Sequence, residues 1–194
     1  MSEITEEKPK PKVLNVPNLL TLARLVLSVL VFVLIGVRWF VPAMITFIIA
    51  ASTDWIDGYY ARKYGQVTKL GRIFDPFVDK IIICGSFIFL AAEPRSGIAS
   101  WMAVLVVARE MLVTGLRSFI EQSGSDFSAN MSGKLKMVFQ CLAVVASLAI
   151  LMNSSANTPV WFERAVAAAV WLAVLSTIQS GTVYILAAAK NFRE

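Results

Sequence analysis

Four aspartates stand in segments that are otherwise almost entirely apolar. They form two pairs, Asp54 with Asp57 and Asp75 with Asp79. A carboxylate in hydrocarbon costs about 2.5–3.5 kcal/mol on insertion scales, so four of them need a compensating partner. Carboxylate oxygens are ligands that Mg²⁺ and Mn²⁺ prefer. The sequence therefore predicts a site for one or two of these ions, held by the four side chains.

The spacing within each pair indicates that helices carry these carboxylates. Residues three or four positions apart share one face of an α-helix, as do Asp54 and Asp57, and Asp75 and Asp79. The segment that joins the two pairs is short, so we expect the two helices to be antiparallel neighbours. Both pairs would then lie at the same membrane depth and could face each other.

The composition argues against several other chemistries. The chain has 194 residues, 57% of them hydrophobic, and no histidine, so imidazole serves neither as base nor as ligand. Cys84 and Cys141 stand in apolar runs without metal-ligand spacing, and we expect two buried thiols. No serine or cysteine stands beside a plausible base, so a covalent intermediate on the protein is not indicated.

Hydropathy divides the chain into a polar N-terminal segment, residues 1–15, and one membrane domain, residues 16–194. The domain holds six apolar segments, each near the ~20 residues that span a bilayer. They cover about 18–37, 41–61, 73–92, 98–119, 134–153 and 161–189. We therefore expect an all-α integral membrane protein, a bundle of six transmembrane helices with a short polar N-terminal segment.

The basic residues predict the orientation. With six spans, both termini lie on one side, and twelve Lys and Arg residues fall there against three on the other side. The positive-inside rule then makes both termini and the acidic site cytoplasmic. The net charge of +5 suits an anionic lipid surface. Because the cations are dispersed over separate loops, no nucleic-acid partner is indicated.

Small residues and one arginine accompany the acids. Gly58 and Ala61 follow the first acidic pair, and Gly71 precedes the second. Their missing side chains leave room for a bulky group beside the metal, or allow close helix contact. Arg62 stands at the predicted cytoplasmic edge. A guanidinium beside a dication suggests a phosphorylated ligand, because both neutralise phosphate oxygens.

Together these residues form the string D-x₂-D-G-x₂-A-R-x₈-G-x₃-D-x₃-D over residues 54–79. The string resembles the signature of the CDP-alcohol phosphatidyltransferase family at every position. The resemblance implies a metal-dependent membrane enzyme, typically a homodimer. Such an enzyme takes a CDP-linked lipid and an alcohol, forms a phosphodiester and releases CMP.

The same resemblance implies separate roles for the signature residues. All four aspartates would hold the metal, and Asp79 would also act as general base on the acceptor hydroxyl. Gly58, Ala61 and Gly71 would border the cytidine and ribose. Arg62 would bind the pyrophosphate.

A second group of charged residues bears on the choice of alcohol. Arg109 and Glu110 fall inside the fourth apolar segment, where they require a polar cavity or an ion-pair partner. Arg117 lies eight positions after Arg109, roughly on the same helix face, and Lys134 and Lys136 open the fifth segment. These cations could form an anion pocket beside the acidic site. An acceptor alcohol that itself carries phosphate would need such a pocket.

From about Val16 onward, the chain resembles the branch of the family that makes phosphatidylglycerophosphate. The shared features are a P-N-x-x-T-x-x-R opening with Asn18, Thr21 and Arg24, an A-R-E followed by L-R, and a G-K before the fifth segment. This resemblance implies that CDP-diacylglycerol is the donor, contacted by Asn18 and Thr21, and that sn-glycerol 3-phosphate is the acceptor. The acceptor phosphate would be bound by Arg117, Lys134, Arg109 and Lys136.

Other acceptors and one other class of protein remain open. Inositol phosphate would also use the basic pocket, whereas phosphatidylglycerol, as in a cardiolipin synthase, would need less of it. The four acids could instead form the ion site of a cation- or proton-coupled carrier. Against a carrier, the acids stand toward one face of the membrane rather than at its midplane. Membrane lipids are expected partners in each case.

Overall fold

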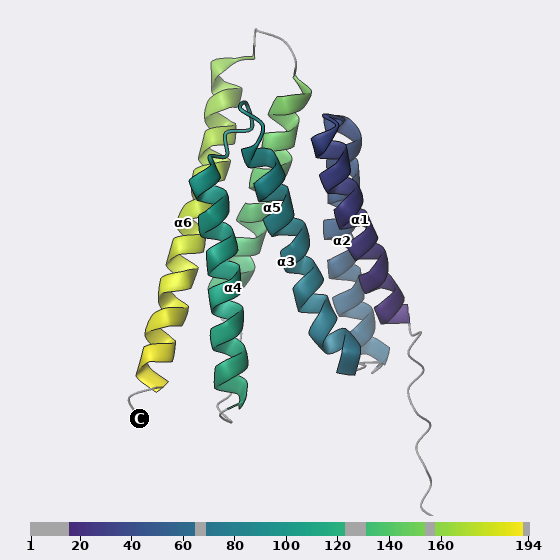
Figure 1. Ribbon diagram of the computed structural model, residues 1–194, viewed down its shortest axis with the longest axis vertical. Coiled ribbons are helices and arrows are strands. Elements are labelled where there is room, and N and C mark those ends of the chain that lie inside the picture. Colours follow the sequence, from purple (N-terminus) through teal and green to yellow (C-terminus); the bar gives the residue numbers. More distant parts are fainter. Residues whose placement is uncertain (1–15, 65–68, 123–130, 154–157, 192–194) are drawn as a thin grey trace, which may run out of the picture.

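The computed structural model describes residues 16–64, 69–122, 131–153 and 158–191 (Figure 1). Within these ranges, the side chains at 16–18, 54–64, 69–76, 118–122, 131–134 and 190–191 lie outside the description. Each predicted apolar segment coincides with a helix. The helices are α1 (Val16–Gly36), α2 (Phe40–Tyr64), α3 (Lys69–Ala91), α4 (Ser100–Gln122), α5 (Met131–Met152) and α6 (Val160–Asn191).

Successive helices run in opposite directions, so the bundle has two distinct ends. In Figure 1, α1, α3 and α5 begin at the lower end, where α2, α4 and α6 finish. We call this lower end, at which α2 ends with Tyr64 and α3 begins with Lys69, the signature end. The opposite end, with the α1–α2 and α3–α4 turns, is called the far end.

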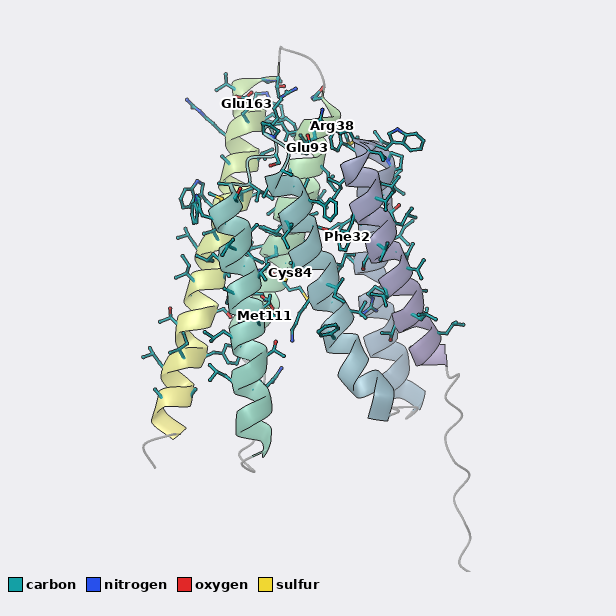
Figure 2. All side chains as sticks on the ribbon, in the orientation of Figure 1. Phe32, Arg38, Cys84, Glu93, Met111 and Glu163 are labelled. Atoms are coloured by element: carbon teal, nitrogen blue, oxygen red, sulfur yellow. The ribbon has the colours of Figure 1, made fainter. Side chains whose placement is uncertain are left out.

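Two turns at the far end depend on backbone conformations that end helices. Arg38 follows α1 with a left-handed φ of 61°, and Gly97 precedes α4 with φ 78°. Glycine adopts such angles without steric cost. An ion pair between Arg38 Nε and Glu93 Oε1, at 3.1 Å, joins the α1–α2 turn to the α3–α4 turn; both residues are labelled in Figure 2.

The packing of α1, α2 and α3 differs in part from the expectation. Over the described residues, α1 packs extensively along both α2 and α3, while α2 and α3 contact each other only slightly. α2 and α3 are antiparallel, as predicted, but they are held together mainly through α1 and α5. A short connecting segment makes two successive helices antiparallel. It does not specify which other helices pack against them, and that is decided by tertiary contacts.

The surface of the bundle is apolar. Val26, Val104, Trp161 and Leu186 are each more than half exposed, and many other large apolar side chains face outward. Soluble monomers rarely expose continuous apolar surface of this extent. In the described residues, three windows are long and apolar enough to cross a membrane, Leu19–Gly36, Leu135–Met152 and Val160–Ala189. The fold is all-helical, with helices suited to an integral membrane protein.

The interior changes character along the bundle. Toward the far end it is an apolar core that includes Ile35, Phe47, Phe87, Leu90 and Leu148. Toward the signature end, charged and polar side chains are buried instead. These are Thr21, Arg24, Glu110, Lys136, Gln140, Thr177 and Ser180. Because buried charge in a membrane helix requires a specific partner, this half of the interior is the candidate functional site.

Candidate active site

The helices place the two acidic pairs at matching distances from the signature end. Asp54 lies ten residues before the end of α2, and Asp79 lies ten residues after the start of α3. Asp57 and Asp75 lie seven and six residues from the same helix ends. At 1.5 Å per residue, these depths are about 15 Å and about 10 Å. The two pairs thus occupy equivalent positions along α2 and α3, as counted from the signature end.

Of the four carboxylates, only that of Asp79 lies within the described side chains, and it pairs with an arginine from another helix. Arg24 Nη1 on α1 donates to Asp79 Oδ1 at 2.6 Å. The Arg24 side chain is 2% exposed and that of Asp79 is 23% exposed. Ser28, one turn later on α1, donates its hydroxyl to the Arg24 carbonyl oxygen at 2.7 Å. Arg24 is thus a buried counter-ion of Asp79, and its guanidinium does not extend to the membrane surface.

A close approach of α1 to α3 brings this pair together. Gly85 on α3 lies against Phe32 on α1, and a Cβ built at Gly85 would stand 2.1 Å from the Phe32 ring. The same ring stacks on Phe89, with centroids 5.3 Å apart and planes 7° apart. Figure 2 shows Phe32 between the two helices. Only glycine allows the ring to lie there, so Gly85 sets the helix separation that Arg24 needs to reach Asp79.

A second charged group lies between α4 and α5 and is centred on Glu110, which is 6% exposed. Its carboxylate accepts from Lys136 Nζ on α5 and from Arg109 Nη1, the latter at 3.2 Å. Lys136 is itself 5% exposed. The ion-pair partner that the sequence required for Arg109 and Glu110 is therefore present. One buried carboxylate here contacts two cations, one from α4 and one from α5.

Arg109 is anchored further by α6. It donates through Nη2 to the Ser180 hydroxyl, and its guanidinium lies 5.6 Å from the ring centroid of Tyr184. Gly181 stands between these two residues, where an added Cβ would come within 3.3 Å of the Arg109 side chain. Arg109 thus joins α4 to α6 through one hydrogen bond and one cation–π contact.

Lys80 is a charged residue that the sequence reading did not single out. It follows Asp79 on α3, and its Nζ donates to the Thr114 hydroxyl of α4 at 2.5 Å. Thr114 in turn donates to the carbonyl oxygen of Glu110 at 2.5 Å. Lys80 lies near charges of both signs, the carboxylates of Glu110 and Asp79 and the guanidinium groups of Arg117 and Arg109. The sequence could have indicated Lys80, because a lysine within an apolar helix is costly and is usually retained for a function.

The remaining predicted residues are placed to different degrees. Thr21 is buried on α1, one turn from Arg24, and Arg117 is half-buried on α4. The other predicted residues occupy helix positions at the signature end, but their side chains lie outside the described ones. They are Asn18 on α1, Asp54, Asp57, Gly58, Ala61 and Arg62 on α2, Gly71 and Asp75 on α3, and Lys134 on α5.

Among the described residues, no cluster of three or more Cys, Asp or Glu side chains that could hold a metal ion occurs. The side chains of Asp54, Asp57 and Asp75 lie outside these described residues. The donor set of the signature, four carboxylates in the signature-end halves of α2 and α3, has the oxygen chemistry that Mg²⁺ and Mn²⁺ take. The residues present therefore fit a hard divalent cation by type and depth.

Comparison with known proteins shows the class of protein that these features define. The chain belongs to the CDP-alcohol phosphatidyltransferase family, whose family model matches residues 14–179. The match spans all of α1 to α5 and most of α6, so the chain is a transferase of this family.

Three bacterial relatives are similar over nearly the whole chain. A Bacillus subtilis protein is 36% identical over 186 residues, covering 88% of this chain and 93% of the relative. An Escherichia coli K12 protein is 35% identical, covering 90% and 94%. One from Rickettsia typhi is 30% identical, covering 92% and 99%. Each is named CDP-diacylglycerol–glycerol-3-phosphate 3-phosphatidyltransferase.

Proposed function

We propose that this protein transfers the phosphatidyl group of CDP-diacylglycerol to the primary hydroxyl of sn-glycerol 3-phosphate, giving phosphatidylglycerophosphate and CMP. The observation that carries this proposal is the complete acidic signature in the signature-end halves of α2 and α3, in a bundle that also buries cations on α4 and α5. The names of relatives that match over most of their length support the choice of donor and acceptor.

In the proposed reaction, the acceptor hydroxyl oxygen bonds to the phosphorus of the phosphatidyl group, and the bond from that phosphorus to the CMP oxygen breaks. The hydroxyl proton passes to the Asp79 carboxylate, which must come within hydrogen-bond reach of it. Arg24 orients Asp79 for this step, since it contacts Oδ1 at 2.6 Å. CMP leaves with its phosphate, so the donor lipid keeps its glycerol ester bonds.

Asp54, Asp57, Asp75 and Asp79 are proposed to hold one or two Mg²⁺ or Mn²⁺ ions. When bound, the metal neutralises charge on the pyrophosphate and on the departing CMP. Gly58, Ala61 and Gly71 would border the nucleoside. Arg62, with Asn18 and Thr21, would bind the rest of the CDP-lipid.

The acceptor phosphate is proposed to bind to Arg117 and Lys134. Arg109 and Lys136, also predicted for this pocket, both contact Glu110. We assign these two cations to the wall of the pocket, where they fix its electrostatic potential and hold α4, α5 and α6 together.

The proposed setting is a bacterial inner membrane. All six helices would span it, with both termini and the signature end in the cytoplasm, where the water-soluble acceptor is present. The diacyl chains would enter between helices from the cytoplasmic leaflet, and the protein would act as a homodimer. The positive charge near the signature end supports this orientation.

The test is CMP release by the purified protein with CDP-diacylglycerol and a panel of acceptors. We expect glycerol 3-phosphate to be used far better than inositol phosphate, phosphatidylglycerol or glycerol. If another acceptor of the panel is preferred, the proposed acceptor is wrong, while the proposed transfer from a CDP-linked lipid to an alcohol stands. Ion flux in reconstituted vesicles without any CMP release would overturn the proposed function in favour of a carrier.

A further inference from the structure

Lys80 has a position that neither the family signature nor the ion pairs of the site explain. It directly follows Asp79 on α3, and successive residues of a helix diverge by about 100°. Asp79 accordingly contacts Arg24 on α1, whereas Lys80 contacts Thr114 on α4. One turn of α3 therefore joins the Arg24–Asp79 pair to the Glu110 group.

The ammonium of Lys80 is held by a neutral group. Its hydrogen bond goes to the Thr114 hydroxyl, and that hydroxyl is fixed in turn by the Glu110 carbonyl oxygen. An ammonium carries three donors, and this bond uses one of them. The Glu110 carboxylate, the nearby acid on α4, is contacted by Arg109 and Lys136.

The charges around Glu110 do not balance. Within the described side chains, Arg109 and Lys136 contact this one carboxylate and Lys80 lies near it. Asp79 also acts favourably on Lys80, but it is itself paired with Arg24. Lys80 is only half-buried, in contrast to Lys136. Excess positive charge beside a membrane interior is costly, and an anionic ligand with several oxygens would offset it.

We propose that Lys80 binds the phosphate of the acceptor and selects phosphorylated alcohols over uncharged ones. The hydrogen bond to Thr114 orients the Lys80 ammonium. Glu110 holds Arg109 and Lys136 on the opposite wall of the acceptor pocket. Because Lys80 adjoins Asp79 in the chain, a phosphate on Lys80 places the acceptor's hydroxyl end on the Asp79 side of α3. This inference rests on the proposed function and adds to it a specificity-determining residue.

The first test is a set of kinetic comparisons on the full-length protein in detergent. Lys80→Met should raise the apparent KM for glycerol 3-phosphate roughly 10- to 100-fold, as expected for a lost hydrogen bond to a charged group. The KM for CDP-diacylglycerol and the Mg²⁺ concentration for half-maximal rate should stay within about twofold. Lys80→Arg should recover most of the acceptor affinity. Thr114→Val should raise the apparent KM for glycerol 3-phosphate only a few-fold, since the ammonium group of Lys80 remains.

A matched control removes a cation elsewhere. Arg164 is exposed in the first turn of α6 at the far end, and Arg164→Met should leave every kinetic constant unchanged. An unchanged acceptor KM in Lys80→Met would overturn the proposal. The proposal would also be overturned if Lys80→Met weakened the apparent affinity for acceptor and for Mg²⁺ equally. Lys80 would then act only through its neighbour Asp79.

A second measurement uses the wild-type protein, so it does not depend on the variants folding. Glycerol 3-phosphate should slow acylation of the Lys80 amine by an amine-reactive reagent, followed by mass spectrometry, and glycerol should not. Equal labelling with both compounds contradicts the proposal. If the protein releases no CMP with any acceptor, the proposed function fails; protection of Lys80 by glycerol 3-phosphate is read out independently of that result.

Discussion

The Arg24 guanidinium on α1 lies 2.6 Å from the Asp79 carboxylate on α3, an ion pair between residues 55 positions apart. Both partners sit where the bundle interior changes from apolar to polar, and Arg24 is almost completely buried. A guanidinium that is itself buried and fixed holds its carboxylate partner in one orientation. The orientation of Asp79 is thus fixed by a helix that carries none of the acidic signature.

The Arg24–Asp79 pair predicts coupled effects on stability and activity. Arg24→Met should lower the free energy of unfolding by about 3–5 kcal/mol, because it leaves a largely buried carboxylate without its counter-ion. It should also reduce CMP release strongly. Thermal unfolding in detergent and an assay of CMP release check the two effects.

The double variant separates these effects. Arg24→Met with Asp79→Asn removes both charges, so most of the stability should return, while CMP release should stay lost because the base is absent. Asp79→Asn alone should keep binding of the CDP-lipid. Wild-type CMP release by Asp79→Asn would disprove the assignment of Asp79 as the base.

Glu110 should be more important for stability than for acceptor binding. Glu110→Gln leaves the Lys136 and Arg109 charges buried without a carboxylate, and we expect a loss of about 3 kcal/mol. Adding Lys136→Met should restore part of it. Glu163→Gln serves as the control, since Glu163 is exposed at the start of α6 and should change stability by less than about 0.5 kcal/mol. Equal unfolding temperatures for Glu110→Gln and Glu163→Gln would contradict the prediction.

Gly85 and Gly115 offer a matched test of helix packing. Gly85→Ala places a Cβ on the Phe32 ring and should destabilise the protein by about 1–3 kcal/mol through overpacking. A Cβ at Gly115 meets nothing within 4 Å. Gly115→Ala should therefore be neutral or stabilise α4 by up to about 1 kcal/mol, since alanine favours helix over glycine. The two variants are compared by thermal unfolding, and a similar response from both would mean that the contact between Phe32 and Gly85 is dispensable.

Metal removal should abolish CMP release reversibly. Treatment with EDTA should stop the reaction, and added Mg²⁺ or Mn²⁺ should restore it. Because a bound metal stabilises only the folded state, about 100 times its Kd should add about 2.7 kcal/mol to the free energy of unfolding. Asp75→Asn should lose both effects. Activity that survives complete chelation would exclude the four aspartates as a catalytic metal site.

Several features of the fold were predictable because they depend on local pattern. Runs of about 20 apolar residues broken by Pro, Gly and charge define six helices, and those boundaries agree with the structure within a few residues. The packing order of the helices was not predictable in the same way. α1 lies along both α2 and α3 through contacts such as Phe32 on Gly85, which join residues far apart in the chain.

The sequence by itself determined the family, the helical class and the depth of the four aspartates. Residue type and spacing along a helix of fixed rise are enough for these conclusions. Only the tertiary structure decided which charges meet. It paired Asp79 with Arg24, placed Lys136 and Arg109 on Glu110, and brought Lys80 to Thr114. All of these contacts except that between Arg109 and Glu110, which lies within α4, link two helices. The energy of a buried charge depends on neighbours that local spacing does not specify.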